Sequence, residues 1–468
     1  MLAQAAVEPD WGGLPRDALE HIAKQLTFVV DYIRFAAVCK PWRSAAYENL
    51  RHRPRQLPFL LIRDPDGSTN ARGIYSLVDK RLLNFRLPVP RAMRCRGSSD
   101  GWLSLIGFDL SITLFNPFSR KHIPLPPMNT IPNPFDDMLC GDTFIQKVIL
   151  SSDPSFTPNF LVVITYSCRA KLAFFRPGDR IWNPIDCGLA SFDDVLYHKG
   201  QFYAVNCKGM VVICDLTSQK PYAVELPVPL VQNSYLIKRY LVEWKGELLQ
   251  IIREFIWEIN DYDDEYRTAS FEVYKLDLSG PMKWVEVTSL GNHIVFLGDN
   301  SSFSVSASDF PVSKRNCIYF TDDHFEQYEP TPQGFFDVGV YNFEDRSIEL
   351  CYPIDNAEMP PPIWPSNIQN WLPEACSFKA RKGSYEKGYC YSSAVYLAGQ
   401  DSPKTVVYDL LLMVLDTFAK SRTIGTNRDF PEEPNPTFGR LRSPKASKEP
   451  KNSGIGIPSE VLELKAKY

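Results

Sequence analysis

The sequence is poor in the residues that build metal centres and disulfide frameworks. Its 468 residues include 11 cysteines and six histidines, and their spacings match no zinc-binding pattern. So few cysteines cannot form a disulfide scaffold, and we interpret them as small, mostly buried side chains in a reducing compartment. The sequence therefore predicts no metal site and no bound cofactor.

An excess of one charge and a long apolar run are missing as well. The 51 basic and 55 acidic residues give a formal net charge of −4, which creates no field for holding nucleic acid or an anionic membrane. Residues 1–8 lack the basic start and apolar core of a signal peptide. The apolar stretch 406–418 is too short to cross a bilayer. We therefore expect a protein of the nucleus or the cytoplasm that binds neither nucleic acid nor membrane.

Sequence signatures of catalysis are also absent. We find no glycine-rich phosphate loop, no Gly-x-Ser-x-Gly and no His-Glu-x-x-His. Acidic clusters at 136–137, 261–265 and 322–323 contain the kind of carboxylates that a glycosidase pairs across a cleft. Adjacent acids in loops are usually solvated, however, and we interpret these clusters as solvated turns. We interpret residues 98–102 as an Asp-Gly turn followed by a core tryptophan, Trp102.

Residues 11–50 carry a helical pattern that the rest of the chain lacks. Apolar residues recur at helical spacing at Leu19, Ile22, Ala23 and Leu26. Asp31 stands where the N-cap of a second helix is expected, and Pro41 separates that helix from a third one. Three short helices cannot bury all their apolar side chains among themselves. They therefore pack on the rest of the chain or offer an apolar surface to a partner.

The same residues resemble an F-box. The pattern has Leu14-Pro15 at its start, Leu19 and Ile22 in the first helix, and Val-Cys-Lys-x-Trp-Arg at 38–43. Ala18 departs from it, because many F-boxes have a larger apolar residue there. The resemblance implies docking on the Skp-type adaptor of a cullin–RING ubiquitin ligase. The residues that it assigns to adaptor binding are Leu14, Pro15, Leu19, Ile22, Leu26, Ile33, Val38, Cys39 and Trp42.

Three of these residues have two possible roles. Val38, Cys39 and Trp42 either close the core of the helical block or touch the adaptor. Leu14, Pro15, Leu19, Ile22 and Leu26 would form or support the docking face.

From residue 57 to 374 the pattern changes to short apolar strands separated by polar turns. Six units of an apolar strand, a turn and an outer strand recur about every 40 to 65 residues, close to the repeat of four-stranded propeller blades. Their turns lie at 79–81, 116–121, 177–180, 217–220, 278–280 and 344–346. We predict a mainly β protein with a small α domain and a β-propeller of about six to seven blades. A pair of β-sandwiches or a jelly roll is the competing architecture.

This region also resembles the propeller-like domain, of the Kelch-like or KIB type, that follows the F-box in many plant proteins. The matching residues are 97–103, 116–119 with 125–127, 273–277 with 284–287, 290–291, 296–298 and 316–323. We predict four segments: an F-box domain at 11–52, the propeller at 57–374, an extension at 375–420 and a mostly disordered tail at 421–468.

The two resemblances together imply a receptor without catalytic residues. The F-box would dock on the Skp-type adaptor, and through it on the cullin and the RING subunit of an SCF-type ligase. The propeller would bind an unidentified protein substrate, whose ubiquitination follows from proximity. The alternative function is a carbohydrate-binding or hydrolytic propeller with a helical docking cap.

Overall fold

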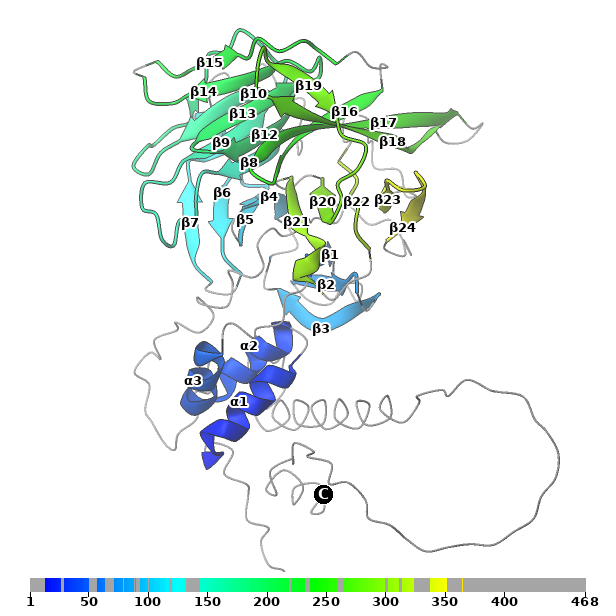
Figure 1. Cartoon of the computed structure of the whole chain (residues 1–468). Coiled ribbons are helices and arrows are strands. Elements are labelled where there is room, and N and C mark those ends of the chain that lie inside the picture. Colours follow the sequence, from blue (N-terminus) through cyan, green and yellow to red (C-terminus); the bar gives the residue numbers. More distant parts are fainter. Residues whose placement is uncertain are drawn as a thin grey trace, which may run out of the picture. The chain divides into compact units, whose positions relative to one another are not determined.

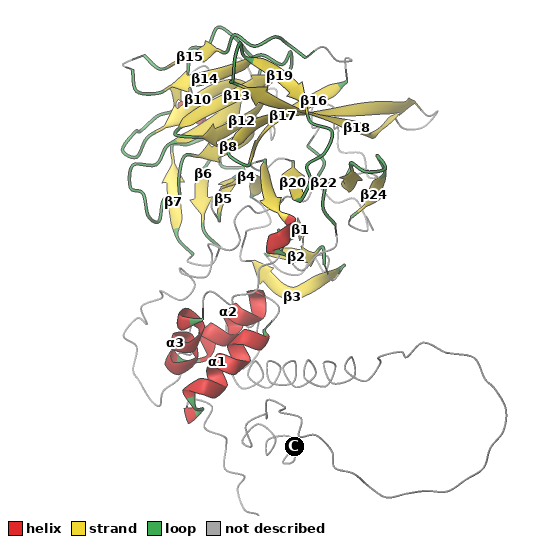
Figure 2. Cartoon of the chain, in the orientation of Figure 1, coloured by secondary structure: helices red, strands yellow, loops and turns green. Residues whose placement is uncertain are grey.

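The computed structural model consists of a helical unit and a strand-rich unit that divide between Pro54 and Arg55 (Figures 1 and 2). It describes residues 13–26, 29–49, 57–63, 71–131, 144–351 and 364, with gaps at 79, 88, 90–92, 100, 118–119, 219, 232–235, 260–263, 299–301, 311–313 and 324–336. The predicted extension at 375–420 and the predicted tail at 421–468 lie outside these described residues.

The helical unit contains the three helices that the sequence predicts. They are α1 (Arg16–Gln25), α2 (Val29–Val38) and α3 (Lys40–Glu48). Pro15 precedes α1 and Pro41 lies in the first turn of α3, where a missing N–H costs no hydrogen bond. The prediction of Asp31 as an N-cap is wrong, because α2 already begins at Val29. Asp31 instead lies in the first turn of α2, where its negative charge interacts favourably with the helix dipole. Its carboxylate accepts a 3.2 Å hydrogen bond from Arg34 Nη1.

The described strands form six sheets, which we number as blades 1 to 6. Blade 1 contains β1 (Leu60–Arg63), β2 (Arg72–Ser76) and β3 (Arg81–Leu87), and blade 2 contains β4 (Arg94–Ser99), β5 (Trp102–Ile106), β6 (Ile112–Phe115) and β7 (His122–Leu125). Blade 3 contains β8 (Ile145–Leu150), β9 (Val162–Tyr166), β10 (Lys171–Phe175) and β11 (Asn183–Pro184), and blade 4 contains β12 (Phe192–His198), β13 (Gln201–Asn206), β14 (Val211–Asp215) and β15 (Tyr222–Glu225).

Blades 5 and 6 complete a six-bladed β-propeller. Blade 5 contains β16 (Ile237–Trp244), β17 (Glu247–Ile259), β18 (Asp264–Asp277) and β19 (Lys283–Glu286). Blade 6 contains β20 (His293–Leu297), β21 (Phe303–Ser306), β22 (Cys317–Phe320), β23 (Gly339–Asn342) and β24 (Ile348–Leu350). Short 3₁₀ helices span Met128–Thr130 and Ala307–Asp309. The fold class predicted from the sequence is confirmed.

Each of the six predicted hairpins is the last strand pair of one blade. The pairs are β2–β3, β6–β7, β10–β11, β14–β15, β18–β19 and β23–β24, all antiparallel. The first strand of such a pair is covered on both faces by neighbouring blades and is therefore apolar, as in β10 (Lys171–Phe175). The second strand is the outer edge of its blade, and β24 is exposed at every position. This contrast made the hairpins visible in the sequence.

Blade 6 departs from the simple four-stranded pattern. Its strands lie in the order β21-β20-β22-β23-β24, and β20 pairs with β22 in parallel. The strand of blade 6 that contacts β16 of blade 5 is β21. The innermost strand of blade 6 is therefore β21, which comes after its neighbour β20 in the sequence. Blade 1 has three described strands, β1 to β3.

The core lies between the blades. Trp102 and Trp182 are fully buried in the apolar cluster between blades 2 and 3. The turn before Trp102 uses Gly101 at φ 83°, a conformation that favours glycine, and Trp102 Nε1 donates a 2.9 Å hydrogen bond to Asp153. The prediction of an Asp-Gly turn with a core tryptophan is therefore confirmed at its described residues.

The described cysteines are all free, in agreement with the absence of a disulfide scaffold. Half of them lie in the interior as small apolar side chains. The buried ones are Cys39, Cys95, Cys214 and Cys317.

Gly97 allows two inner strands to approach one another closely. A methyl group at this position of β4 would overlap the backbone carbonyl oxygen of Val148 in β8. We expect Gly97→Ala to lower the free energy of unfolding by about 1–3 kcal/mol, because the overlap is with a backbone atom and one of the two inner strands must shift to relieve it. Gly280→Ala is the matched control, since a methyl group added there would have no atom within 4 Å. Urea denaturation of both variants tests this, and equal midpoints would contradict it.

Candidate functional site

The predicted adaptor-binding residues divide into surface and interior positions. Pro15 is exposed and Leu14 is half-buried, immediately before α1. The side chain of Ile33 lies outside the described part of the structure. The buried members of the set are Leu19, Ile22, Leu26, Val38, Cys39 and Trp42. These six side chains support the helical unit from within, and adaptor binding by the whole set stays a prediction.

The interior of the helical unit is closed by aromatic residues. The ring centres of Phe35 in α2 and Trp42 in α3 lie 4.7 Å apart, so the two rings pack these helices against each other. Tyr32 adds a 2.7 Å hydrogen bond from its hydroxyl to the carbonyl oxygen of Ala46. Of the two roles left open for Trp42, the structure places it in the helical core.

The surface of α1 is polar among the residues that the structure describes. Arg16, Asp17 and Lys24 are exposed, and Arg16 forms an ion pair with Glu48 at the end of α3. The expected apolar surface is therefore confined, on the described part of α1 and the residues before it, to the short entry segment that contains Leu14 and Pro15. None of the described helices is long and apolar enough to cross a membrane.

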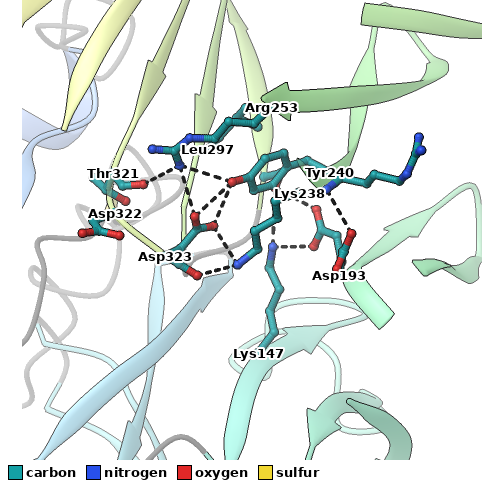
Figure 3. Close-up of polar contacts among 12 residues, drawn as sticks. Lys147, Asp193, Lys238, Tyr240, Arg253, Leu297, Thr321, Asp322 and Asp323 are labelled. Carbon is teal, nitrogen blue, oxygen red and sulfur yellow. Dashed lines mark hydrogen bonds and ion pairs between the residues drawn. The ribbon is translucent and has the colours of Figure 1, made fainter. Parts of the chain in front are cut away.

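The propeller contains a group of mostly buried polar and charged side chains, most of which Figure 3 shows, that we call the ionic cluster. Its members come from three inner strands, from β17 and from the segments that follow β22 and precede β23. The ionic cluster consists of Lys147, Asp193, Asp194, Lys238, Tyr240, Arg253, Asp323 and Asp337.

Arg253 is the centre of the ionic cluster. Its guanidinium donates through Nη1 to Asp323 Oδ1 at 3.1 Å and through Nη2 to Asp337 Oδ2 at 3.0 Å. Its Nε donates to Thr268 Oγ1 at 2.8 Å. The side chain is fully buried, and its charged end lies 4.5 Å from the ring centre of Phe320. One side chain therefore connects blades 5 and 6.

The acidic pair at 322–323 contradicts the prediction of a solvated turn. Asp322 and Asp323 are both buried. Burial alone would raise the pKa of Asp323, but the charges of Lys238, Arg253 and Lys147 outweigh it and lower that pKa. Asp323 is therefore a buried, ion-paired carboxylate. The predicted acidic turn at 136–137 lies outside the described residues, and so do residues 261–263 of the turn predicted at 261–265. Asp264 and Glu265 contradict that prediction, because they lie in the strand β18.

Two adjacent aspartates of β12 bind the edge of β16. Asp194 Oδ2 accepts a 2.9 Å hydrogen bond from the backbone N–H of Leu241, and Asp193 Oδ2 accepts one of 3.1 Å from Arg239 N. An innermost strand has no further strand on its inner side, so these carboxylates satisfy donors that would otherwise need water. Asp194 also forms an ion pair with Lys147 of β8. The ionic cluster thus joins blades 3, 4 and 5.

The contacts of the ionic cluster assign it a role in holding blades together. The carboxylates of Asp194, Asp323 and Asp337 accept bonds from cations and from N–H or O–H donors. No group of three or more His, Cys, Asp or Glu side chains that could hold a metal ion occurs in the part of the chain that the structure describes.

Asp193 is a partly buried carboxyl group, and we expect it to make the stability of the propeller depend on pH. Its burial raises its pKa to about 7, although Lys238 and Arg239 act in the opposite direction. The folded state therefore binds this proton more tightly than the unfolded state, whose pKa is about 3.9, and stability falls as the pH rises between these two values. We expect Asp193→Asn to unfold like the wild type at pH 4 and to be more stable than it at pH 8. Urea midpoints at both values test this, and a variant that is weaker at pH 8 would contradict it.

The cations of the ionic cluster were not recognised from the sequence. Arg253 and its neighbour Glu254 interrupt an otherwise largely apolar stretch, residues 248–252 and Phe255–Ile256, in which Gln250 is the other polar residue. A charged side chain in such a run is rarely buried unless it is paired, and this was the signal that could have found it. The sequence does not indicate which residues pair with Arg253, because Asp323 and Asp337 are about 70 and 84 positions away along the chain.

Comparisons with known proteins agree with both parts of this architecture. The KIB1-4 beta-propeller family model matches residues 74–342. The F-box protein SKIP23 of Arabidopsis thaliana is 29% identical over 408 residues, which cover 76% of this chain and 95% of that protein. The F-box protein At2g17036 of the same plant is 26% identical over 415 residues, with 79% of this chain and 98% of that protein covered.

A third relative, the F-box protein At2g26160 of Arabidopsis thaliana, is 27% identical over 342 residues and covers 68% of this chain and 96% of that protein. The family match begins within β2 and ends with β23. It therefore includes strands of all six blades and covers more than half of the 468 residues. The chain belongs to the KIB1-4 beta-propeller family.

Proposed function

We propose that the protein is the substrate-recognition subunit of an SCF-type cullin–RING ubiquitin ligase. The observation that carries the proposal is the joint presence of an F-box-like helical unit and a KIB1-4 propeller in one chain. Relatives that carry the name F-box protein align with most of this chain and with nearly their own whole length.

The two units would divide the work of the receptor. The helical unit would bind a Skp-type adaptor, with Leu14 and Pro15 as its accessible apolar residues. The propeller would hold the protein to be modified near the conjugating enzyme carried by other subunits, and the rate would rise because the effective concentration of target lysines rises. In this proposal the chain itself supplies no residue that makes or breaks a bond, and it works in the nucleus or the cytoplasm.

Adaptor capture by the full-length chain tests the proposal. We expect the wild type to retain a recombinant plant Skp-type adaptor, and Leu14→Ala with Pro15→Ala to weaken retention at least about tenfold, because hot-spot apolar contacts each contribute about 1–2 kcal/mol or more. The matched control is Leu82→Ala with Pro124→Ala, two exposed residues of the propeller. Circular dichroism checks that each variant folds.

Two outcomes would overturn the proposed function. One is a folded wild-type chain that does not retain the adaptor. The other is glycan binding or hydrolysis by a chain that fails to bind the adaptor, which would favour the carbohydrate-directed alternative.

A further inference from the structure

The first two strands of blade 3, β8 and β9, are joined by a long loop that spans residues 151–161. The corresponding connections are only the short turns 199–200 in blade 4 and 245–246 in blade 5. A loop that is longer than its strand pair requires is a common place for binding residues. We call it the 151–161 loop, and it carries Phe156, which is 71% exposed.

Internal hydrogen bonds hold Phe156 in this exposed position. Asp153 Oδ1 accepts a 2.9 Å bond from Nε1 of the fully buried Trp102 and a 2.7 Å bond from Ser155 N. The carbonyl oxygen of Asp153 accepts bonds from the N–H groups of Phe156 and Thr157, at 3.2 Å and 3.0 Å. The loop also contains two prolines, which restrict its backbone. A loop that is fixed in advance loses little conformational entropy when it binds a partner.

The turn 176–182 between β10 and β11 lies at the same end of blade 3 as the 151–161 loop. The register shows this, because Phe175 at the end of β10 pairs with Val162 at the start of β9. The turn carries Ile181, which is 54% exposed. Two large apolar side chains are therefore exposed at one end of a single blade.

Buried aromatic rings join these two connections. The ring centre of Phe175 lies 6.3 Å from that of Phe160 in the loop and 6.0 Å from that of Trp182 in the turn. All three residues are buried, so they fix the backbone on which Phe156 and Ile181 stand. Exposed apolar side chains on a fixed backbone are suited to anchor another protein.

Blade 4 contributes a third connection to this end of the propeller. Its inner strand β12 contacts β8, and Lys147 near the start of β8 forms an ion pair with Asp194 near the start of β12. Further along both strands, Ile149 and Val195 belong to the same apolar cluster. The two strands therefore run in the same direction. The turn that follows β12 lies at the end where the 151–161 loop begins, and it carries the exposed Lys199.

The exposed charges of these three connections are all basic. They belong to Arg176, Arg180 and Lys199. The acidic residues of the same connections, Asp153 and Asp179, are half-buried and accept hydrogen bonds from the backbone of their own turns. Neither Arg180 nor Lys199 forms an ion pair within the part of the chain that the structure describes. Exposed cations therefore lie at the same end of the propeller as the exposed apolar side chains, which favours an acidic partner.

We propose that this end of blades 3 and 4 binds an acidic segment of another protein that also carries large apolar side chains. Phe156 and Ile181 would contact the apolar side chains, and Arg180 and Lys199 would attract the carboxylates. Nucleic acids and anionic membranes fit less well, because so few cations neutralise few phosphates and the whole chain has a net charge of −4. The inference rests on the proposed function only in taking that protein to be the target of the ligase.

Peptide binding to the full-length chain tests the proposal. The probe is a fluorescent peptide of glutamate and leucine. One counterpart has glutamine in place of glutamate, and the other has serine in place of leucine. We expect the wild type to bind the probe and neither counterpart, and binding to weaken as the salt concentration rises, because salt screens exposed charges. Equal binding of either counterpart, or no binding of the probe, would overturn the proposal.

Two double variants locate the binding surface. Phe156→Ala with Ile181→Ala should weaken binding of the probe at least about tenfold, because it removes both apolar anchors. Arg180→Gln with Lys199→Gln should weaken binding about fivefold and should also reduce its dependence on salt.

Matched controls carry the same changes elsewhere on the propeller. Phe108→Ala with Leu278→Ala removes apolar side chains that are 71% and 64% exposed, and Lys208→Gln with Arg346→Gln removes two exposed cations. Both should leave binding within about twofold. Equal weakening by test and control variants would overturn the proposal.

Vesicles of phosphatidylserine provide the last comparison. Wild-type binding to these vesicles that is lost in the Phe156→Ala, Ile181→Ala variant would assign the surface to a membrane and overturn the choice of a protein partner. Adaptor capture is measured on the same variants, so a failure of the proposed function is seen separately.

Discussion

Replacement of Arg253 by methionine is expected to lower the free energy of unfolding by about 3–5 kcal/mol, the usual result of removing one partner from a buried ion pair. Asp323 has a side chain that is 1% exposed and would lose one of its two cations. Asp337 would lose the hydrogen bond that its carboxylate accepts from the guanidinium of Arg253. Urea denaturation measures the effect, and the matched control is Arg180→Met at an exposed position.

A compensating variant separates the lost charge from the lost volume. If the penalty arises from buried carboxylates without a cation, then Asp323→Asn and Asp337→Asn in the Arg253→Met background should restore part of the stability. An unchanged or larger loss in the triple variant would mean that the packing of Arg253 against Phe320 carries the effect.

The loss in Arg253→Met should also depend on pH. The pKa of Asp323 is lowered in the folded state, so its contribution to stability is present above the unfolded pKa of about 3.9 and is lost as the pH falls through the folded pKa. In Arg253→Met this carboxylate has less cationic compensation and takes up its proton at a higher pH. We therefore expect the difference between variant and wild type to shrink as the pH is lowered from 7 towards 4. A difference that is constant over this range would contradict the assignment.

The architecture could be predicted from the sequence where local pattern determines it. The strand at 211–215 is a run of apolar residues followed by a polar turn, and such runs identified the strand pair at the outer side of every blade. The parallel pairing of β20 with β22 and the position of β21 could not be predicted in this way. Strand order in a sheet depends on contacts between distant residues, which leave no local periodicity.

The candidate sites show the same limit. The F-box pattern was recognisable because its residues lie within a continuous stretch, from Leu14 to Arg43. Which of its apolar side chains face inward depends on how the three helices pack on one another, and Ile22 of α1 and Leu26 directly after it are buried. The ionic cluster was missed for a related reason, since Lys147 and Asp194 meet only when blades 3 and 4 are side by side.

Replacement of Trp364 by alanine is the second change for which we expect a large effect. Trp364 is fully buried in the apolar cluster between the last blade and the first, which also contains Leu60 of β1 and Phe296 of β20. Its ring centre lies 5.3 Å from that of Phe296, and its Nε1 donates a 3.1 Å hydrogen bond to the carbonyl oxygen of Leu297. Removal of such a side chain costs about 3–5 kcal/mol. The cluster around Trp364 joins blade 1 to blade 6, whose strands lie at opposite ends of the propeller sequence. The loss of stability should therefore appear first where these two blades meet.

Amide hydrogen exchange on the full-length chain tests where the loss appears. We expect Trp364→Ala to reduce protection most strongly in β1 and β20 and least in β13 of blade 4, because the lost contacts belong to the junction of blades 6 and 1. Trp364→Phe keeps most of the apolar contact and loses the hydrogen bond, which predicts a smaller loss of about 1–2 kcal/mol. The half-buried Trp284 of β19 provides the control substitution to alanine. Two results would contradict a role of Trp364 in joining blade 6 to blade 1. One is that Trp364→Ala unfolds at the wild-type midpoint, and the other is that it loses as much protection in β13 as in β1.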